Sequence, residues 1–264
     1  MSAGGAGEAS GGSYSKDHLM IFGIVGGLLG IYATHFLSDF HPELAFIGSI
    51  GSICAIIWGV DAVRRVCSYG LGTGVPSIGM LALGMGVVAA LFGLSIAGFA
   101  GPIVAFIIAC IMGVVIGQLA NKYIGMNIPV MERVMVEIAG AGALTIMGFS
   151  STIAGTFMFE EIMFATVTTG FIAVVYIAGG LAILHPFNAS LGPDEQQDRT
   201  IMLGVLDGSI AMAVVGIAAM SIVTTVIGVA LMCITYIKHY KFVKRDAYKI
   251  LGTGLLPNKE ELEG

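Results

Sequence analysis

Residues 77–120 read SIGMLALGMGVVAALFGLSIAGFAGPIVAFIIACIMGVVIGQLA and contain no charged side chain. A membrane-spanning helix needs about 20 mainly apolar residues, so this stretch is long enough for two of them. Gly101 and Pro102 interrupt it near the middle, and both residue types favour turns. We therefore expect two spans, over 77–99 and 102–120, joined as a helical hairpin.

The composition of the whole chain agrees with a membrane location. The chain has 264 residues, of which 56% are hydrophobic and 11% are charged, and its mean hydropathy is +0.94. Soluble domains carry about 25% charged residues, so lipid or other membrane proteins must cover most of this surface. A basic face with interleaved aromatic residues is missing from the sequence, which argues against nucleic acid as a partner. These features predict an all-α, polytopic transmembrane bundle.

Other apolar runs surround the first pair at 19–37, 44–60, 135–157, 162–184 and 201–237. Breaks inside a pair are short, as at 38–43 and at Glu160-Glu161, whereas the longer breaks carry the basic residues. This pattern indicates helical hairpins joined by cytoplasmic loops. The expected domains are a mobile N-terminal tail over 1–18, a transmembrane domain over 19–237 with a cytoplasmic loop over 185–200, and a basic, then acidic tail over 238–264.

The distribution of basic residues predicts the orientation, because Lys and Arg collect in cytoplasmic loops. They follow the second, fourth and last runs at Arg64, Arg65, Lys122, Arg133, Lys238, Lys241, Lys244 and Arg245. This places the N-terminus in the cytoplasm and requires an even number of spans. A single helix over 201–237 would be roughly 55 Å long, against a hydrocarbon core of about 30 Å. Two short spans turning near 216–221 would give eight crossings, which we favour; a membrane-surface segment before one span would give seven.

An internal repeat supports the even number. Leu71-Gly72-Thr73-Gly74 follows one basic pair, and Leu251-Gly252-Thr253-Gly254 follows Lys244-Arg245 at the same spacing. A looser copy lies at 124–129. Repeated units are common in transport folds, although chance among 39 glycines is the alternative.

Two acidic residues inside apolar stretches are the candidate ion-pathway residues, because intramembrane charges are costly. Asp207 is followed by Gly208 and Ser209, and its carboxylate beside hydroxyl and carbonyl oxygens would suit Na⁺. The alternatives are a helix N-cap or an inter-subunit hydrogen bond. Glu137 is the second candidate, but Arg133 precedes it by one helical turn, so a local ion pair is the simpler interpretation.

Catalytic motifs are missing from the sequence. There is no phosphate-binding P-loop, nucleophile elbow or HExxH zinc motif. The four cysteines lie far apart and form no CxxC pair. We therefore assign no catalytic residue and leave any metal site unassigned.

Residues 185–200, HPFNASLGPDEQQDRT, form the one long polar stretch between spans. Functional contacts concentrate in loops of this kind, so a docking surface for a soluble partner is predicted here. Its candidate residues are His185, Asn188, Asp194, Glu195, Asp198 and Arg199.

The same stretch resembles the corresponding loop of the C subunit of tetrahydromethanopterin S-methyltransferase. The chain length, the Gly/Ser-rich start and the Leu-Gly-Thr-Gly loops are similar too. The resemblance implies a membrane complex of methanogenic archaea that transfers a methyl group from methyl-tetrahydromethanopterin to coenzyme M and exports Na⁺. It also implies that the D and E subunits are neighbours, and that a corrinoid (cobamide) is held by another subunit and not by this chain.

Basic residues near the cytoplasmic face suggest a companion hypothesis. Arg64, Arg65 or Lys244 would attract the sulfonate of coenzyme M. Two other functions remain open, namely a stand-alone secondary transporter and a purely structural membrane anchor.

Overall fold

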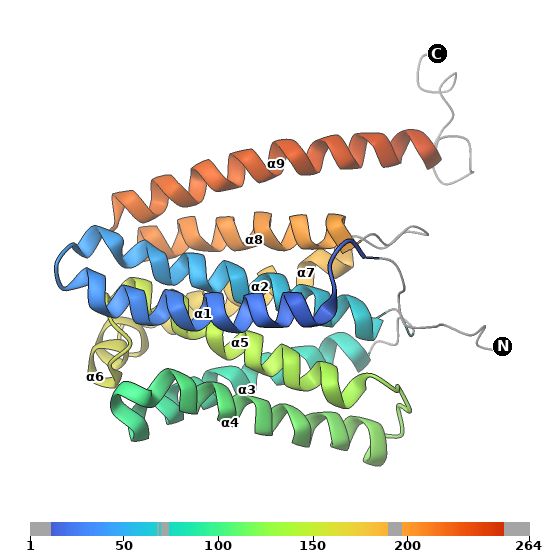
Figure 1. The fold of residues 1–264 in the computed structure, drawn as a ribbon, viewed down its shortest axis with the longest axis horizontal. Helices are drawn as coiled ribbons and strands as arrows, with labels where there is room; N and C mark the ends of the chain where they lie inside the picture. Colours follow the sequence, from blue (N-terminus) through green and yellow to red (C-terminus); the bar gives the residue numbers. More distant parts are fainter. Residues whose placement is uncertain (1–11, 68, 70–73, 190–196, 251–264) are drawn as a thin grey trace.

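The computed structural model describes residues 12–67, 69, 74–189 and 197–250, and these ranges contain helices and no strand. The all-α prediction is confirmed. The long helices are α1 (Lys16–Ser38), α2 (Phe46–Cys67), α3 (Gly74–Ala97), α4 (Gly101–Gln118), α5 (Met131–Ala154), α7 (Phe171–Ala189), α8 (Gln197–Ala218) and α9 (Ile222–Ile250) (Figure 1). The short segments are η1 (Pro42–Ala45), η2 (Gly98–Ala100), η3 (Leu119–Tyr123), α6 (Phe159–Ile162) and η4 (Met163–Val167).

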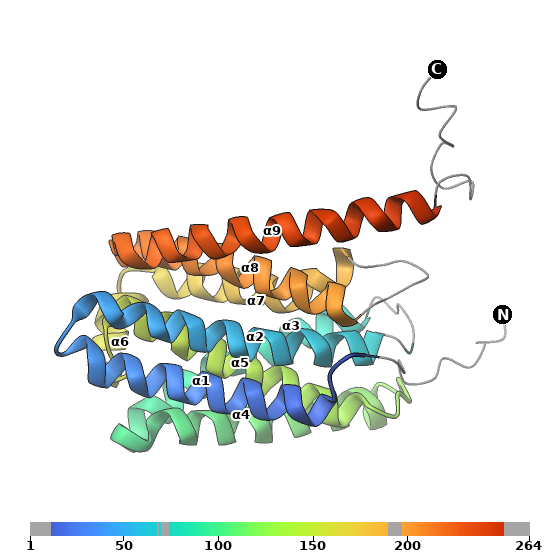
Figure 2. The same cartoon turned by 45° about the horizontal axis from the view of Figure 1, so that its top comes forward.

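The long helices lie along one axis, and each reverses the direction of the one before it (Figure 1). Helix α1 therefore begins, and α9 ends, at the same end of the bundle. Helix α5 lies at the centre of the bundle. Of its most apolar 18-residue stretch, 94% is buried, and the helix packs against α1, α2, α3, α4 and α7. Helix α9 lies at the edge of the bundle and packs against α8 (Figure 2). Only 17% of its most apolar 18-residue stretch is buried.

Six described segments are long and apolar enough to cross a membrane, or seven if the bent pair of α6–η4 and α7 counts as one span. This is the pattern of a multi-pass membrane protein. One of the six, Gly79–Tyr123, is 45 residues long and contains most of α3 and all of α4. These two helices pack side by side, which confirms the predicted hairpin.

Two boundaries differ from the prediction because the hydropathy pattern and the helix do not end together. Helix α8 begins inside the expected 185–200 loop, and α9 continues to Ile250, well into the expected tail. Polar residues such as Lys, Gln and Arg favour helices in water, so a helix continues past the apolar run. The turn between α8 and α9 lies at 219–221, inside the predicted turn region.

The expected continuous span over 162–184 is wrong. The chain bends by 88° between 159–167 and 171–186, and Gly170 takes a positive φ of 79° there. Just before the bend, the hydroxyls of Thr168 and Thr169 donate to the backbone carbonyls of Phe164 and Ala165 at 2.6 and 2.8 Å. Such bonds back to the preceding turn bend helices, which apolar content alone does not reveal.

Candidate functional site

A buried cluster of charged side chains lies near the end of the bundle where α2 ends and α5 and α8 begin. Asp61, Arg64 and Arg65 are each at most 4% exposed. Asp61 accepts hydrogen bonds from Arg64 at 3.0 Å and from Arg65 at 2.9 Å. These residues are three and four positions apart, which places them on one face of α2.

Glu137 of α5 joins this cluster across the helix interface. It accepts hydrogen bonds from Arg65, from Arg133 Nε at 2.8 Å and from Trp58 Nε1 at 3.1 Å. The Arg133 bond confirms the predicted ion pair, whereas the Arg65 and Trp58 bonds do not follow from the sequence. Three donors already surround this carboxylate, so its part in an ion pathway stays a prediction.

Gln197 links the cluster to the N-terminal segment. Its Nε2 donates to Asp61 Oδ1 at 2.9 Å and to the Tyr14 carbonyl at 3.0 Å, and its Oε1 accepts from the Tyr14 N–H at 3.0 Å. Arg133 donates to Asp17 at 2.9 Å. The expected mobile tail includes residues 13–17, but these contact α5 and α8; residues 1–11 lie outside the described part of the chain.

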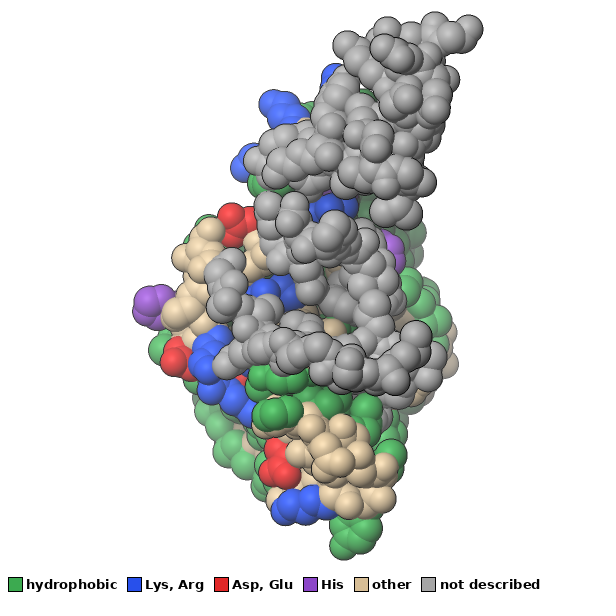
Figure 3. Space-filling view, turned by 90° about the vertical axis from the view of Figure 1, so that its right-hand side faces the viewer, with side chains coloured by type: hydrophobic (Ala, Val, Ile, Leu, Met, Phe, Trp, Pro, Cys, Tyr) green, Lys and Arg blue, Asp and Glu red, His purple; other side chains and the backbone are tan. Residues whose placement is uncertain are grey.

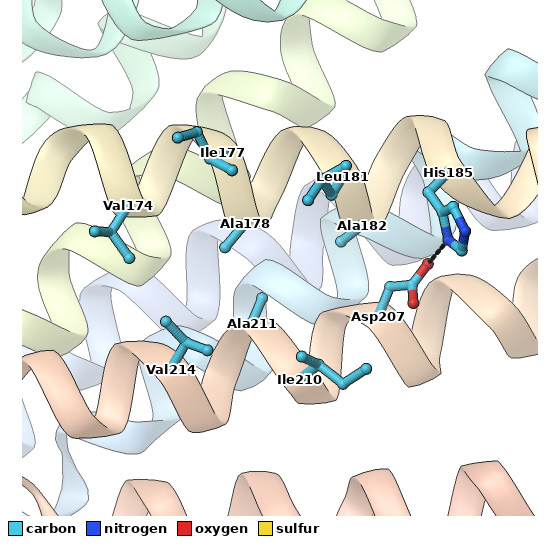
Figure 4. Close-up of a pocket in the computed structure, with 10 residues that line it drawn as sticks. All are labelled: Val174, Ile177, Ala178, Leu181, Ala182, His185, Asp207, Ile210, Ala211 and Val214. Atoms are coloured by element: carbon cyan, nitrogen blue, oxygen red, sulfur yellow. Dashed lines mark hydrogen bonds and ion pairs between the residues drawn. The ribbon is translucent and has the colours of Figure 1, made fainter.

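The second predicted acid, Asp207, lines an apolar groove between α7 and α8 (Figure 4). Its Oδ2 lies 2.8 Å from Nδ1 of His185, and the Asp207 side chain is 16% exposed. Asp207 sits in the middle of α8, which begins at Gln197, so the N-cap interpretation is wrong. The pair lies at one end of the groove, and the other described lining residues are not ionisable.

The rest of the groove is hydrocarbon, and its volume is about 500 Å³. Ile177 and Leu181 are both 59% exposed, so the groove opens at the outside of the bundle. The remaining lining residues are Val174, Ala178, Ala182, Ile210, Ala211 and Val214. Ser209 is buried and does not line the groove, and its hydroxyl donates to the Val205 carbonyl at 2.6 Å.

The other predicted residues are spread over the same end of the bundle. Arg64 and Arg65, expected to attract an anion, are buried and paired with carboxylates. Lys244 is exposed on α9. Asp198 and Arg199 lie in the first turn of α8, and His185 and Asn188 lie in α7 rather than in a loop. Asp194, Glu195 and most of the Leu-Gly-Thr-Gly repeat lie outside the described residues.

A view onto this end shows Lys, Arg, Asp and Glu side chains gathered among apolar ones (Figure 3). Within the described residues, no group of three or more His, Cys, Asp or Glu side chains could hold a metal ion. The arrangement at Asp207 can instead accept a hydrogen bond or bind a hard cation through carboxylate oxygen.

Apolar helices with a buried ion cluster at one end and a carboxylate in an outward-facing groove define a multi-pass membrane protein. The family model for the C subunit of tetrahydromethanopterin S-methyltransferase matches residues 1–260. The C subunit of Methanosarcina barkeri is 55% identical over 270 residues, covering 100% of both chains. That of Methanothermobacter thermautotrophicus is 40% identical over 265 residues, covering 97% of this chain and 98% of the relative.

The chain therefore belongs to the family of C subunits of tetrahydromethanopterin S-methyltransferase. It is one component of this methyltransferase of methanogens, as the resemblance of residues 185–200 implied. Neither the ion cluster nor the groove contains, among its described residues, a nucleophile activated by a neighbouring base.

Proposed function

We propose that this chain is part of the membrane core of a complex that couples methyl transfer to Na⁺ export. In this proposal the methyl group passes from methyl-tetrahydromethanopterin, through a corrinoid on another subunit, to coenzyme M. The D and E subunits and the corrinoid-binding subunit are the proposed partners. The ion passes through the membrane part, and Asp207 contributes to its path.

The Asp207–His185 pair at the open groove carries this proposal. At about 1.5 Å per residue, Asp207 lies roughly 15 Å from the start of α8, close to half of a hydrocarbon core of about 30 Å. A carboxylate at that depth is expensive in lipid. Because the groove faces outward, a neighbouring protein that covered it would enclose Asp207 and could add oxygen ligands for Na⁺.

We expect Asp207→Asn to abolish the Na⁺ stimulation of methyl transfer in the purified complex and to leave assembly intact. Asparagine keeps the shape and one carbonyl oxygen but removes the charge that compensates a bound cation. The measurement is the rate of coenzyme M methylation as a function of Na⁺ concentration, at constant ionic strength.

Asp17→Asn is the matched control. Asp17 forms an exposed ion pair with Arg133, and such pairs contribute little to stability. Unchanged Na⁺ dependence in Asp207→Asn would remove this residue from the path. Na⁺ transport by the purified chain alone would instead support a stand-alone transporter, and full activity without Na⁺ dependence would support a structural anchor.

The basic residues support a topology of eight crossings with both ends of the chain in the cytoplasm. Arg64 and Arg65 lie in the last turn of α2, Lys16 begins α1, and Arg133 lies in the first turn of α5. These helix ends all lie at one end of the bundle (Figure 1). In this count, α3 and α4 are two separate membrane crossings. The acidic residues Glu160 and Glu161 lie at the other end, in α6.

Cysteine labelling tests this topology. In intact cells, a membrane-impermeant maleimide should label Glu160→Cys but not Lys244→Cys, and should label both in opened membranes. Both positions are exposed in the chain, so the difference reports the side of the membrane. Labelling of Lys244→Cys in intact cells would require an odd number of crossings.

With this proposed topology, the predicted docking surface would face the cytoplasm. Asp198 and Arg199 lie in the first turn of α8 beside the charge cluster, and Lys244 lies near the end of α9. The C-terminal end of α9 extends beyond the neighbouring helices (Figures 1 and 2). We propose that Asp198 and Arg199 contact the corrinoid-binding subunit. We propose Lys244 as the accessible cation that attracts the sulfonate of coenzyme M.

A further inference from the structure

A polar pocket of about 500 Å³ lies at the end of the bundle opposite the charge cluster. It is formed where α1 and α5 end, beside α6 and the turn between α8 and α9. Most of its polar side chains offer oxygen atoms. They are Ser38, Asp39, Thr152, Thr156, Glu161 and Ser221, with His35 beside them.

The charge in this pocket is unbalanced. The Asp39 and Glu161 side chains are exposed, and neither carboxylate has a hydrogen-bond or ion-pair partner among the residues that the structure describes. In the same part of the chain, no Lys or Arg lies in the segments that form the pocket's end of the bundle. Helix C-termini carry partial negative charge, and those of α1 and α5 add to the two carboxylates. The pocket therefore favours a cation.

Ser38 gives a second, independent observation. This side chain lines the pocket and is 9% exposed, yet its hydroxyl has no hydrogen-bond partner within the described residues. A buried polar group without a partner costs about 1–3 kcal/mol, and such exceptions call for an explanation. A bound ion would satisfy the Ser38 oxygen, because hydroxyl, carbonyl and carboxylate oxygens are ligands of hard cations.

The neighbouring groups are compatible with an ion at this place. His35 Nδ1 lies 2.7 Å from the Thr156 hydroxyl, which also accepts the Met158 N–H at 3.2 Å. Thr152 donates to the Gly148 carbonyl at 3.0 Å, and its hydroxyl lies 2.8 Å from that of Ser49. These bonds fix the pocket wall and leave the carboxylates and the Ser38 hydroxyl for a ligand.

We propose that this pocket binds Na⁺ at the outer face of the membrane, through Asp39, Glu161 and the Ser38 hydroxyl. All three offer oxygen, whereas transition metals favour sites with imidazole or thiolate ligands. Cation binding stands on this geometry, whereas the choice of Na⁺ and the placement at the outer face rest on the proposed function and topology. The pocket's role as the place where exported Na⁺ leaves the membrane rests on the proposed function.

The test measures Na⁺ binding to the purified intact complex from the linewidth of the sodium NMR signal. Choline replaces Na⁺ as the Na⁺ concentration is lowered. The double variant Asp39→Asn/Glu161→Gln should weaken the site by about tenfold or more, a loss of about 1.4 kcal/mol or more. Ser38→Ala should weaken it by a smaller factor. The matched control is Glu43→Gln/Glu160→Gln, which removes two carboxylates from the same end without touching the pocket lining.

A loss of affinity in the pocket variants but not in the control supports the site. If the pocket variant and the control variant lose affinity equally, Na⁺ responds only to the general surface charge. If the affinity does not change in the pocket variant, the pocket binds no Na⁺. Either result overturns the proposal. The same preparations distinguish it from the proposed pathway. If Asp207→Asn leaves the Na⁺ stimulation unchanged while the pocket variants lose Na⁺, the pathway through Asp207 fails and the outer site stands.

Discussion

Replacing Glu137 with alanine is expected to destabilise the protein by about 3–5 kcal/mol. Glu137 accepts hydrogen bonds from Arg65, Arg133 and Trp58, and both Glu137 and Arg65 are at most 3% exposed. Removal of the carboxylate leaves Arg65 buried beside Asp61, which it already shares with Arg64. The remaining buried charges of Asp61, Arg64 and Arg65 then no longer sum to zero, and water reaches them poorly.

The measurement is the temperature at which the purified complex loses this chain. Glu132→Gln is the control, because Glu132 lies on the same helix but is only partly buried. The double variant Glu137→Met/Arg65→Met should be more stable than Glu137→Ala, since it restores the balance between Asp61 and Arg64. If Glu137→Ala dissociates at the same temperature as Glu132→Gln, the cluster has no structural role.

This cluster shows which part of the site the sequence could predict. The Asp61–Arg64 and Arg133–Glu137 contacts are three and four residues apart, so helix geometry alone predicts them. The Arg65–Glu137 contact joins residues 72 apart and depends on which faces of α2 and α5 meet. Hydropathy does not resolve that question in a bundle whose central helices are apolar all round.

The groove illustrates the same limit. Asp207 stands out in the sequence because a lone carboxylate in an apolar run is unusual, and His185 stands out through its place in a polar stretch. Nothing in their separation of 22 residues links the two. Their meeting depends on α7 continuing to Ala189 and on α8 beginning at Gln197, and a polar stretch does not reveal either boundary.

The fold itself was more predictable, because the apolar runs mark most of the helices, and glycines let these helices pack. Glycines inside apolar runs let helices approach closely, and the structure confirms this between α1 and α2. A Cβ placed on Gly30 would lie 2.6 Å from Gly51 Cα, and one placed on Gly51 would lie 2.9 Å from Gly30 Cα. Both neighbours are backbone atoms, so no side-chain rotation can relieve the overlap.

Gly30→Ala should therefore destabilise the protein by about 1–3 kcal/mol, although alanine is the better helix former by about 1 kcal/mol. Gly180→Ala is the matched control, because the nearest atom to a Cβ there is Leu83 Cδ1 at 3.9 Å. The same substitution should leave the complex as stable as before, or stabilise it. The dissociation temperatures of the two complexes should thus change in opposite directions or by clearly different amounts.

Equal changes in the two variants would mean that α1 can move away from α2 without cost. That result would also bear on the proposed outer pocket, because α1 takes part in it. Helix α1 supplies Ser38 to the outer pocket, and α2 supplies Asp61, Arg64 and Arg65 to the buried cluster. If the Gly30–Gly51 contact fixes α1 against α2, then Gly30→Ala should also weaken Na⁺ binding at the outer pocket, whereas Gly180→Ala should not.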